Sequence, residues 1–167
     1  MGLFSFLSPL TPLAAAEELR DLATSSGISE QEEYVARAVK TEAHILVRER
    51  ILFRMSFTEA SVSYFNMKQP HPKIRETYEH LERMFVRYIR AQPSLSESVA
   101  RELWAKARED YIVRTPEDLA ARMMTNIHNS TFHEIDIPGR VVFLELVGRY
   151  ARDTMTRAGE LTKKLRE

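Results

Sequence analysis

The side chains best suited to bind a metal gather in one short segment of the chain. His128, His133, Glu134 and Asp136 bring imidazole and carboxylate groups together, a combination that suits iron, manganese or zinc. Their spacing matches none of the common ligand patterns. Polar residues are also frequent in loops that bind nothing. A solvated or capping loop is therefore favoured here, and a metal site on these four residues is the fallback.

Two further cofactor classes find little support. Helical bundles hold di-iron sites through Glu-x-x-His pairs on facing helices, and that pair does not occur in the sequence. Glu76 and His80 lie one helical turn apart, but on the charged side of their predicted helix. A haem pocket needs an apolar site around one histidine, whereas the neighbours of His128 are polar. The sequence predicts no cofactor.

Three arginines mark a candidate contact for an anion or an acidic partner. Arg83, Arg87 and Arg90 fall on one side of a predicted helix, near its end. Guanidinium groups in such a row can bind a phosphate or an acidic segment. Ion pairs within the chain are the simpler interpretation.

A second group of arginines lies in the most apolar part of the chain. Arg48, Arg50 and Arg54 alternate there with large apolar residues. A guanidinium removed from water must be paired. Each is therefore predicted to meet a glutamate of its own or a neighbouring helix, or an anionic partner.

The composition excludes several classes of function. The 167 residues include 24 basic and 24 acidic side chains and no Cys. Balanced charge removes the general attraction to nucleic acid, and the lack of Cys removes disulfides and thiolate chemistry. None of the five Gly forms a phosphate-binding loop. No apolar run approaches the ~18 residues of a membrane span, so a soluble protein inside the cell is favoured.

The first ten residues form an apolar arm. Pro9 and Pro12 prevent one continuous helix through it. The arm is predicted either to fold back on its own core or to dock into a partner or a second copy. Contact with a membrane surface is less favoured, because the usual basic face is missing. The predicted partner-binding side chains are Leu3, Phe4, Phe6, Leu7 and Leu10.

Capping signals and apolar periodicity predict about six helices. They begin near Thr11, Ser29, Pro72, Ser94, Thr115 and Asp136. The segment of about 29–68 contains neither Pro nor Gly, so it is predicted to be one long central helix, straight or kinked. The chain is thus predicted to be all-α, with one domain over 11–167 and the arm over 1–10.

The middle of the predicted long helix is apolar on every side. Such a helix is normally enclosed by other helices or shared with another chain. A hairpin over 51–65 is an alternative, since large apolar residues alternate there with polar ones, but its turn lacks Gly or Asn. A strand pair of 132–137 with 141–147 is a second alternative. Helix is favoured in both places.

These features predict a non-enzymatic helical interaction module, such as an adaptor, an assembly factor or a subunit of a larger complex. It would dock on another protein or a second copy through the arm and the central helix. The alternative is a metal- or small-molecule-binding helical enzyme or sensor that uses the loop from His128 to Asp136.

Overall fold

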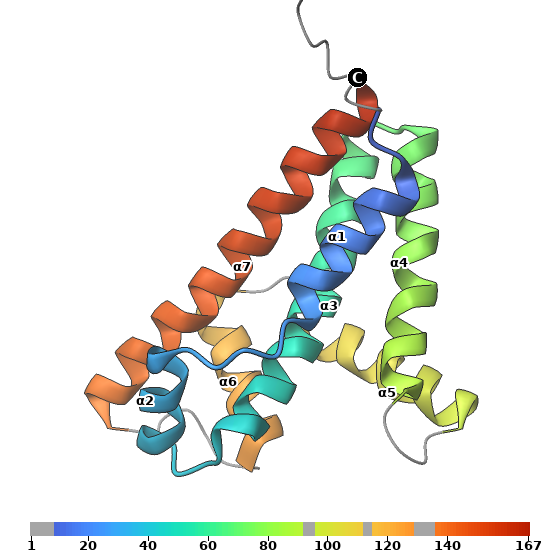
Figure 1. Ribbon diagram of the computed structural model, residues 1–167. Coiled ribbons are helices and arrows are strands. Elements are labelled where there is room, and N and C mark those ends of the chain that lie inside the picture. The colour runs from blue at the N-terminus through green and yellow to red at the C-terminus, as the bar shows by residue number, and fades with distance from the viewer. Residues whose placement is uncertain (1–8, 92–95, 112–114, 129–135) are drawn as a thin grey trace, which may run out of the picture.

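The computed structural model describes residues 9–91, 96–111, 115–128 and 136–167. These residues form helices and no strand, which confirms the all-α class. The helices are α1 (Pro12–Thr24), α2 (Glu30–Ala38), α3 (Ala43–Lys68), α4 (Pro72–Arg90), α5 (Glu97–Asp110), α6 (Pro116–His128) and α7 (Ile137–Arg166) (Figure 1).

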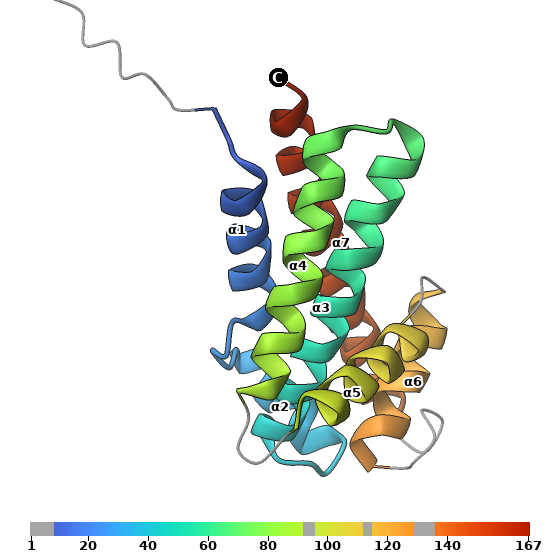
Figure 2. The ribbon, with the colours of Figure 1, turned by 90° about the vertical axis from the view of Figure 1, so that its right-hand side faces the viewer.

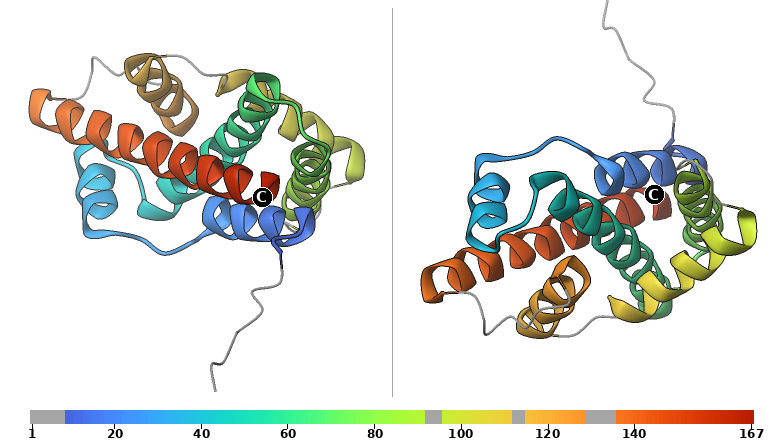
Figure 3. Two further views of the ribbon diagram at one scale, coloured as in Figure 1. Left: turned by 90° about the horizontal axis from the view of Figure 1, so that it is seen from above. Right: turned by 90° about the horizontal axis from the view of Figure 1, so that it is seen from below.

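The two longest helices, α3 and α7, organise the bundle. Helices α1 and α4 run beside the carboxyl-terminal halves of α3 and α7, while α2, α5 and α6 surround the other end (Figures 1 and 2). Seen from above or below, α7 crosses the bundle with α1 and α2 on one side and α6 on the other (Figure 3). No helix in the described ranges is both long and apolar enough to span a bilayer.

Helix α3 is the central spine. It contacts each of the other six described helices and contributes to two apolar clusters. One contains Phe85 and Leu161 with residues of α1 and α5, and the other contains Phe53, Tyr111 and Tyr150 with residues of α2 and α6. The predicted enclosure of this apolar helix is confirmed, and the chain's own helices provide it.

Local capping explains where several helices begin. The Thr11 hydroxyl accepts from Ala14 N at 3.1 Å, and the Asp136 carboxylate accepts from Gly139 N at 2.7 Å. Ser29 and Glu32 form the predicted capping box. These side chains satisfy backbone donors that a helix start leaves free.

The single helix predicted over 29–68 is wrong. The chain breaks between α2 and α3, where Lys40 adopts a left-handed conformation with φ 54°. Lys40 N donates to Arg37 O at 3.1 Å and Thr41 N donates to Ala36 O at 2.9 Å. This is a Schellman ending, which usually has Gly at the position of Lys40. Because no Gly stands here, the break could not be predicted from the residue types.

One helix start needs correction, and the structure decides between helix and the two strand alternatives where it describes them. Helix α5 starts two residues later than predicted, because Ser96 rather than Ser94 caps it, with Val99 N 3.4 Å from its hydroxyl. The hairpin alternative over 51–65 is wrong, since α3 contains that whole segment. The second alternative is a strand pair of 132–137 with 141–147. Residues 141–147 are part of α7, so they form no strand, and residues 132–135 lie outside the described residues.

Candidate functional site

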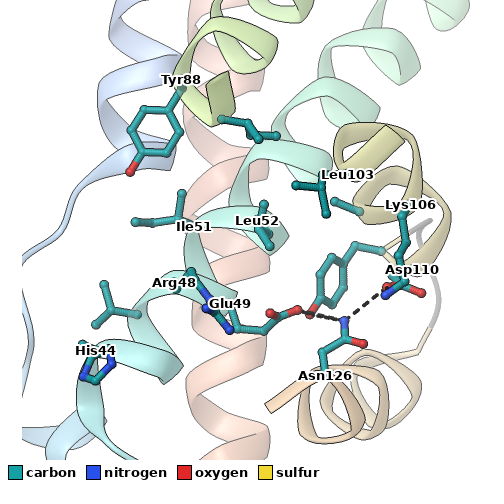
Figure 4. Close-up of a pocket in the computed structure, with 14 residues that line it drawn as sticks. His44, Arg48, Glu49, Ile51, Leu52, Tyr88, Leu103, Lys106, Asp110 and Asn126 are labelled. Atoms are coloured by element: carbon teal, nitrogen blue, oxygen red, sulfur yellow. Dashed lines mark hydrogen bonds and ion pairs between the residues drawn. The ribbon is translucent and has the colours of Figure 1, made fainter. Parts of the chain in front are cut away.

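A cleft of about 750 Å³ lies between α3, α4, α5 and α6. Its volume falls within the range of about 300–1,000 Å³ typical of small-molecule sites. Leu103 keeps 42% of its surface exposed, so it lies where the cleft meets solvent. The apolar wall is formed by Val47, Ile51, Leu52, Ile89, Leu103 and Ala107 (Figure 4).

Glu49 of α3 forms the polar floor of the cleft. It is only 5% exposed, and its Oε1 accepts hydrogen bonds from the Tyr111 hydroxyl and from Asn126 Nδ2, the latter at 2.8 Å. Tyr111 closes α5, and Asn126 lies in the last turns of α6. Three helices therefore converge on one carboxylate (Figure 4).

Asp110 is joined to the same network. Asn126 Nδ2 lies 3.2 Å from Asp110 Oδ2, so one amide group bridges two carboxylates. Asp110 also pairs with Lys106 at 3.3 Å and with Arg122 at 3.6 Å. For Glu49, by contrast, no described cation lies within 4 Å, and no described donor reaches its Oε2. Among the described residues, the buried Glu49 carboxylate is therefore compensated only by neutral donors.

Tyr111 acts in this network as a donor. Burial, followed by the charge of Glu49 and the hydrogen bond to it, raises the pKa of the Tyr111 phenol far above its ordinary value. The phenol thus keeps its proton at neutral pH and directs it at Glu49.

Cationic side chains surround the mouth of the cleft. Arg48 is exposed, and the Lys106 side chain is 67% exposed. His44 is also exposed and lies 3.1 Å from Glu42 on its own helix. The lining therefore combines the buried Glu49 carboxylate with the exposed Arg48 guanidinium, while Lys106 is paired with Asp110 (Figure 4).

Among the arginines of the apolar stretch, Arg50 meets the predicted partner on a neighbouring helix. It is 4% exposed and lies 2.5 Å from Glu32 Oε1 of α2. It also donates to Gly27 O at 3.0 Å and to Ser25 O. Tyr150 of α7 donates to the same Glu32 oxygen at 2.5 Å. This buried pair fastens α2 to α3 and α7.

A third buried carboxylate belongs to Glu59, on the α5-facing side of α3. Arg108 Nε lies 2.9 Å from Glu59 Oε2 and also bonds the Tyr78 hydroxyl at 3.1 Å through Nη2. Burial raises the pKa of Glu59, and the interaction with the Tyr78 hydroxyl and the charge of Arg108 offset this only in part. Burial together with Glu59 raises the pKa of Tyr78 to about 12. This cluster joins α3, α4 and α5.

The predicted metal-binding segment is only partly described. His128 is the last residue of α6, and Asp136 caps α7. His133 and Glu134 lie outside the described residues, as does the rest of 129–135. Within the described ranges, no three His, Asp or Glu side chains are grouped so that they could hold a metal.

The other predicted contacts lie on the surface or outside the described residues. Leu10 of the arm is half-buried and packs against the core, whereas residues 1–8 are not described. Arg83, Arg87 and Arg90 are exposed on α4. Arg83 donates to the Glu79 carbonyl at 3.0 Å, and Arg90 pairs with Glu97 at 3.2 Å. Their role as an anion contact stays a prediction.

Sequence reasoning missed the cleft. Neither Glu49 nor Tyr111 is among the candidate site residues that the sequence predicts. One signal was present, namely a carboxylate within the most apolar stretch of the chain. Nothing local connected it to Asn126, which lies 77 positions later.

No protein-family model matches the chain, and comparison with curated proteins and with solved structures gives no match. The geometry of the cleft is therefore the basis for a functional assignment.

Proposed function

We propose that this protein is a small-molecule-binding helical domain whose cleft accepts a ligand with a protonated amine and an apolar body. The observation that carries the proposal is the Glu49 carboxylate, which is buried at the floor of the cleft with no cation beside it among the described residues. The predicted alternative of a helical small-molecule sensor is thus kept, but on different residues.

The protonated amine of the proposed ligand is inferred from what the buried Glu49 carboxylate requires. A carboxylate removed from water is stabilised by donors or by an opposite charge. Two neutral donors meet Glu49 Oε1, while Oε2 accepts from no described residue. A ligand ammonium group is both a donor and a cation, so it supplies what the protein leaves unmet.

The apolar part of the proposed ligand is inferred from the side chains that form the wall of the cleft. Aliphatic side chains such as Ile51, Leu52 and Leu103 line the space above Glu49, and covering them releases water. The positive charge of the exposed Arg48 disfavours an amine beside it. The ligand is therefore expected to insert amine first, with its apolar part towards the opening.

The proposal can be tested with a matched pair of ligands. 4-Phenylbutylamine and 4-phenylbutanol share one apolar body and differ in the charged group. Calorimetric titration of the full chain is expected to show tighter binding of the amine. A charge-assisted hydrogen bond contributes about 1.5–3 kcal/mol, which corresponds to a preference of about ten-fold or more.

Two variants test whether Glu49 causes the preference for the amine over the alcohol. Glu49→Gln keeps the shape of the side chain and is expected to bind amine and alcohol equally. Glu109→Gln changes an exposed glutamate of α5 that does not line the cleft, and it should retain the preference. An amine preference that survives Glu49→Gln, or no binding of either compound, would overturn the proposal.

We also propose that the arm mediates self-association. Support comes from the apolar Leu3, Phe4, Phe6 and Leu7 of the arm and from Leu13, which leaves 45% of its surface exposed just after them. Light scattering should give a mass above one chain for the full protein and one chain after removal of residues 1–8. Equal masses for the two proteins would contradict a docking role for the arm.

A further inference from the structure

We propose that a second pocket, between α2, α3 and α7, binds a phosphate group through Arg54 and Arg149. This site is separate from the cleft above Glu49 and does not depend on the function proposed for it. The pocket measures about 300 Å³, and the residues that form its polar lining are Ser29, Glu32, Arg50, Arg54, Arg149 and Tyr150.

Among the described residues, Arg54 is a cation without a counter-charge at ion-pair distance. It is half-buried, and no described carboxylate lies within 4 Å of it. Its nearest acceptors are Leu22 O and Ser25 Oγ, both at 3.4 Å from Nη1. Its Nε is buried and has no hydrogen-bond partner among the described residues. No described residue accepts from its Nη2, so this group keeps donors available for an anion.

The Tyr150 ring fixes the position of Arg54. The Arg54 Cζ lies 4.8 Å from the ring centroid, within the range of a cation–π contact. Tyr150 is itself held by its hydrogen bond to Glu32. The guanidinium plane is thus already positioned, which reduces the entropy cost of binding an anion.

The local charge favours an anion. Arg50, Arg54 and Arg149 face the pocket, and the one acid in its lining is Glu32, which Arg50 already neutralises. The next acid, Asp153, acts on Arg54 from beyond ion-pair distance. Burial, with repulsion from Arg50, lowers the pKa of the Arg54 guanidinium, so an anion placed there relieves an unfavourable interaction.

A phosphate group fits this arrangement better than a single carboxylate. Its several oxygens can accept from two guanidinium groups at once, and arginine recognises phosphate through paired donors. Arg149 is exposed, so it can approach the ligand from the open side. Inorganic phosphate and a phosphomonoester share this chemistry.

Calorimetric titration of the full chain with inorganic phosphate, and separately with methyl phosphate, tests the site at constant ionic strength. Binding of either probe is expected, and their relative affinities identify free phosphate or a monoester as the better ligand. Arg54→Gln and Arg149→Gln are each expected to weaken binding by about ten-fold or more, as loss of a charge-assisted contact predicts. Arg152→Gln removes an exposed arginine of α7 that does not line the pocket, and it should bind as the parent does.

The proposal fails if neither probe binds, or if Arg152→Gln weakens binding as much as Arg54→Gln, which would show general charge attraction. Arg149→Gln keeps the test decisive if Arg54→Gln does not fold, because Arg149 is exposed. Glu49→Gln should leave phosphate binding unchanged, so failure here and failure of the amine cleft can be told apart.

Discussion

The Tyr111 hydroxyl donates a hydrogen bond to the Glu49 carboxylate although the two residues lie 62 positions apart. This contact ties the end of α5 to the central helix at the floor of the cleft. Asn126 adds α6 to the same carboxylate. The position of Glu49 is therefore set by three helices, and the floor should be rigid.

Removing the phenol oxygen tests this connection. Tyr111→Phe leaves Glu49 Oε1 with one donor instead of two, and loss of a partner for a buried acceptor costs about 1–3 kcal/mol of unfolding free energy. Urea unfolding can be followed through Trp104, the one Trp of the chain, which is 3% exposed against Phe85. Tyr88→Phe is the control, because the Tyr88 hydroxyl bonds no described residue. Equal losses in the two variants would contradict the network.

The buried pair of Arg50 and Glu32 should matter far more than an ion pair on the surface. Arg50→Met leaves the Glu32 charge buried without its cation, and breaking such a pair costs about 3–5 kcal/mol. Arg101→Ala removes an exposed pair with Glu97, whose side chains are 63% and 52% exposed, and should cost at most about 1 kcal/mol. Denaturant unfolding of both variants measures the contrast. A small loss in Arg50→Met would show that the pair does not fasten α2.

Glu32 makes stability fall in acid. Burial alone raises the pKa of Glu32, but hydrogen bonds from Tyr150 and Ser29 and the charge of Arg50 outweigh it, so the pKa lies below the ordinary 4.5. The stability from this ionised carboxylate is fully present above pH 4.5 and is lost as the pH falls through the lowered pKa. The destabilisation by Glu32→Gln, measured by unfolding across pH, should therefore shrink as the solution becomes more acidic.

Glu59 should show the opposite dependence. Its raised pKa means that the folded chain holds this proton more tightly than the unfolded chain does. The resulting stability is present below pH 4.5 and is lost as the pH rises through the raised pKa. The destabilisation by Glu59→Gln should then be largest at low pH and shrink towards neutrality. The same trend in Glu32→Gln and Glu59→Gln would contradict these assignments.

Two glycines of α7 allow a matched test of how closely the helix is packed at each position. A Cβ at Gly148 would lie 3.5 Å from Arg152 Nη1, an ordinary contact, whereas one at Gly159 would lie 3.1 Å from the Phe65 ring. Gly148→Ala should raise stability by about 0.5–1 kcal/mol, because alanine loses less backbone entropy in a helix. Gly159→Ala should gain less or lose stability, since the ring must move. Equal gains in thermal unfolding would show that Phe65 does not pack closely on α7.

Helix starts could be predicted because their causes are local. The caps at Thr11, Ser29 and Asp136 lie within three residues of the backbone groups they satisfy. The end of α2 could not be predicted in the same way, since a left-handed Lys40 replaces the usual Gly. The exposure of Leu103 could not be predicted for a different reason, because it follows from the cleft, which leaves that side of α5 uncovered.

The sites depend on distant parts of the chain. Sequence spacing indicated that Arg50 and Arg54 required counter-charges, but not that Arg50 would find Glu32 while Arg54 would not. Arg50 and Glu32 meet because the turn after α2 lets this short helix pack back against α3 and α7. The partners of Glu49 lie on helices that follow much later, so only the packed bundle reveals them.

The most direct test of the central claim is a crystal structure of the full chain with 4-phenylbutylamine. We expect the amine nitrogen within hydrogen-bond distance of Glu49 Oε2, about 3 Å, with the phenyl group among Ile51, Leu52 and Leu103. An amine that binds elsewhere, or one that enters the cleft with its nitrogen at the mouth and no contact to Glu49, would contradict the account.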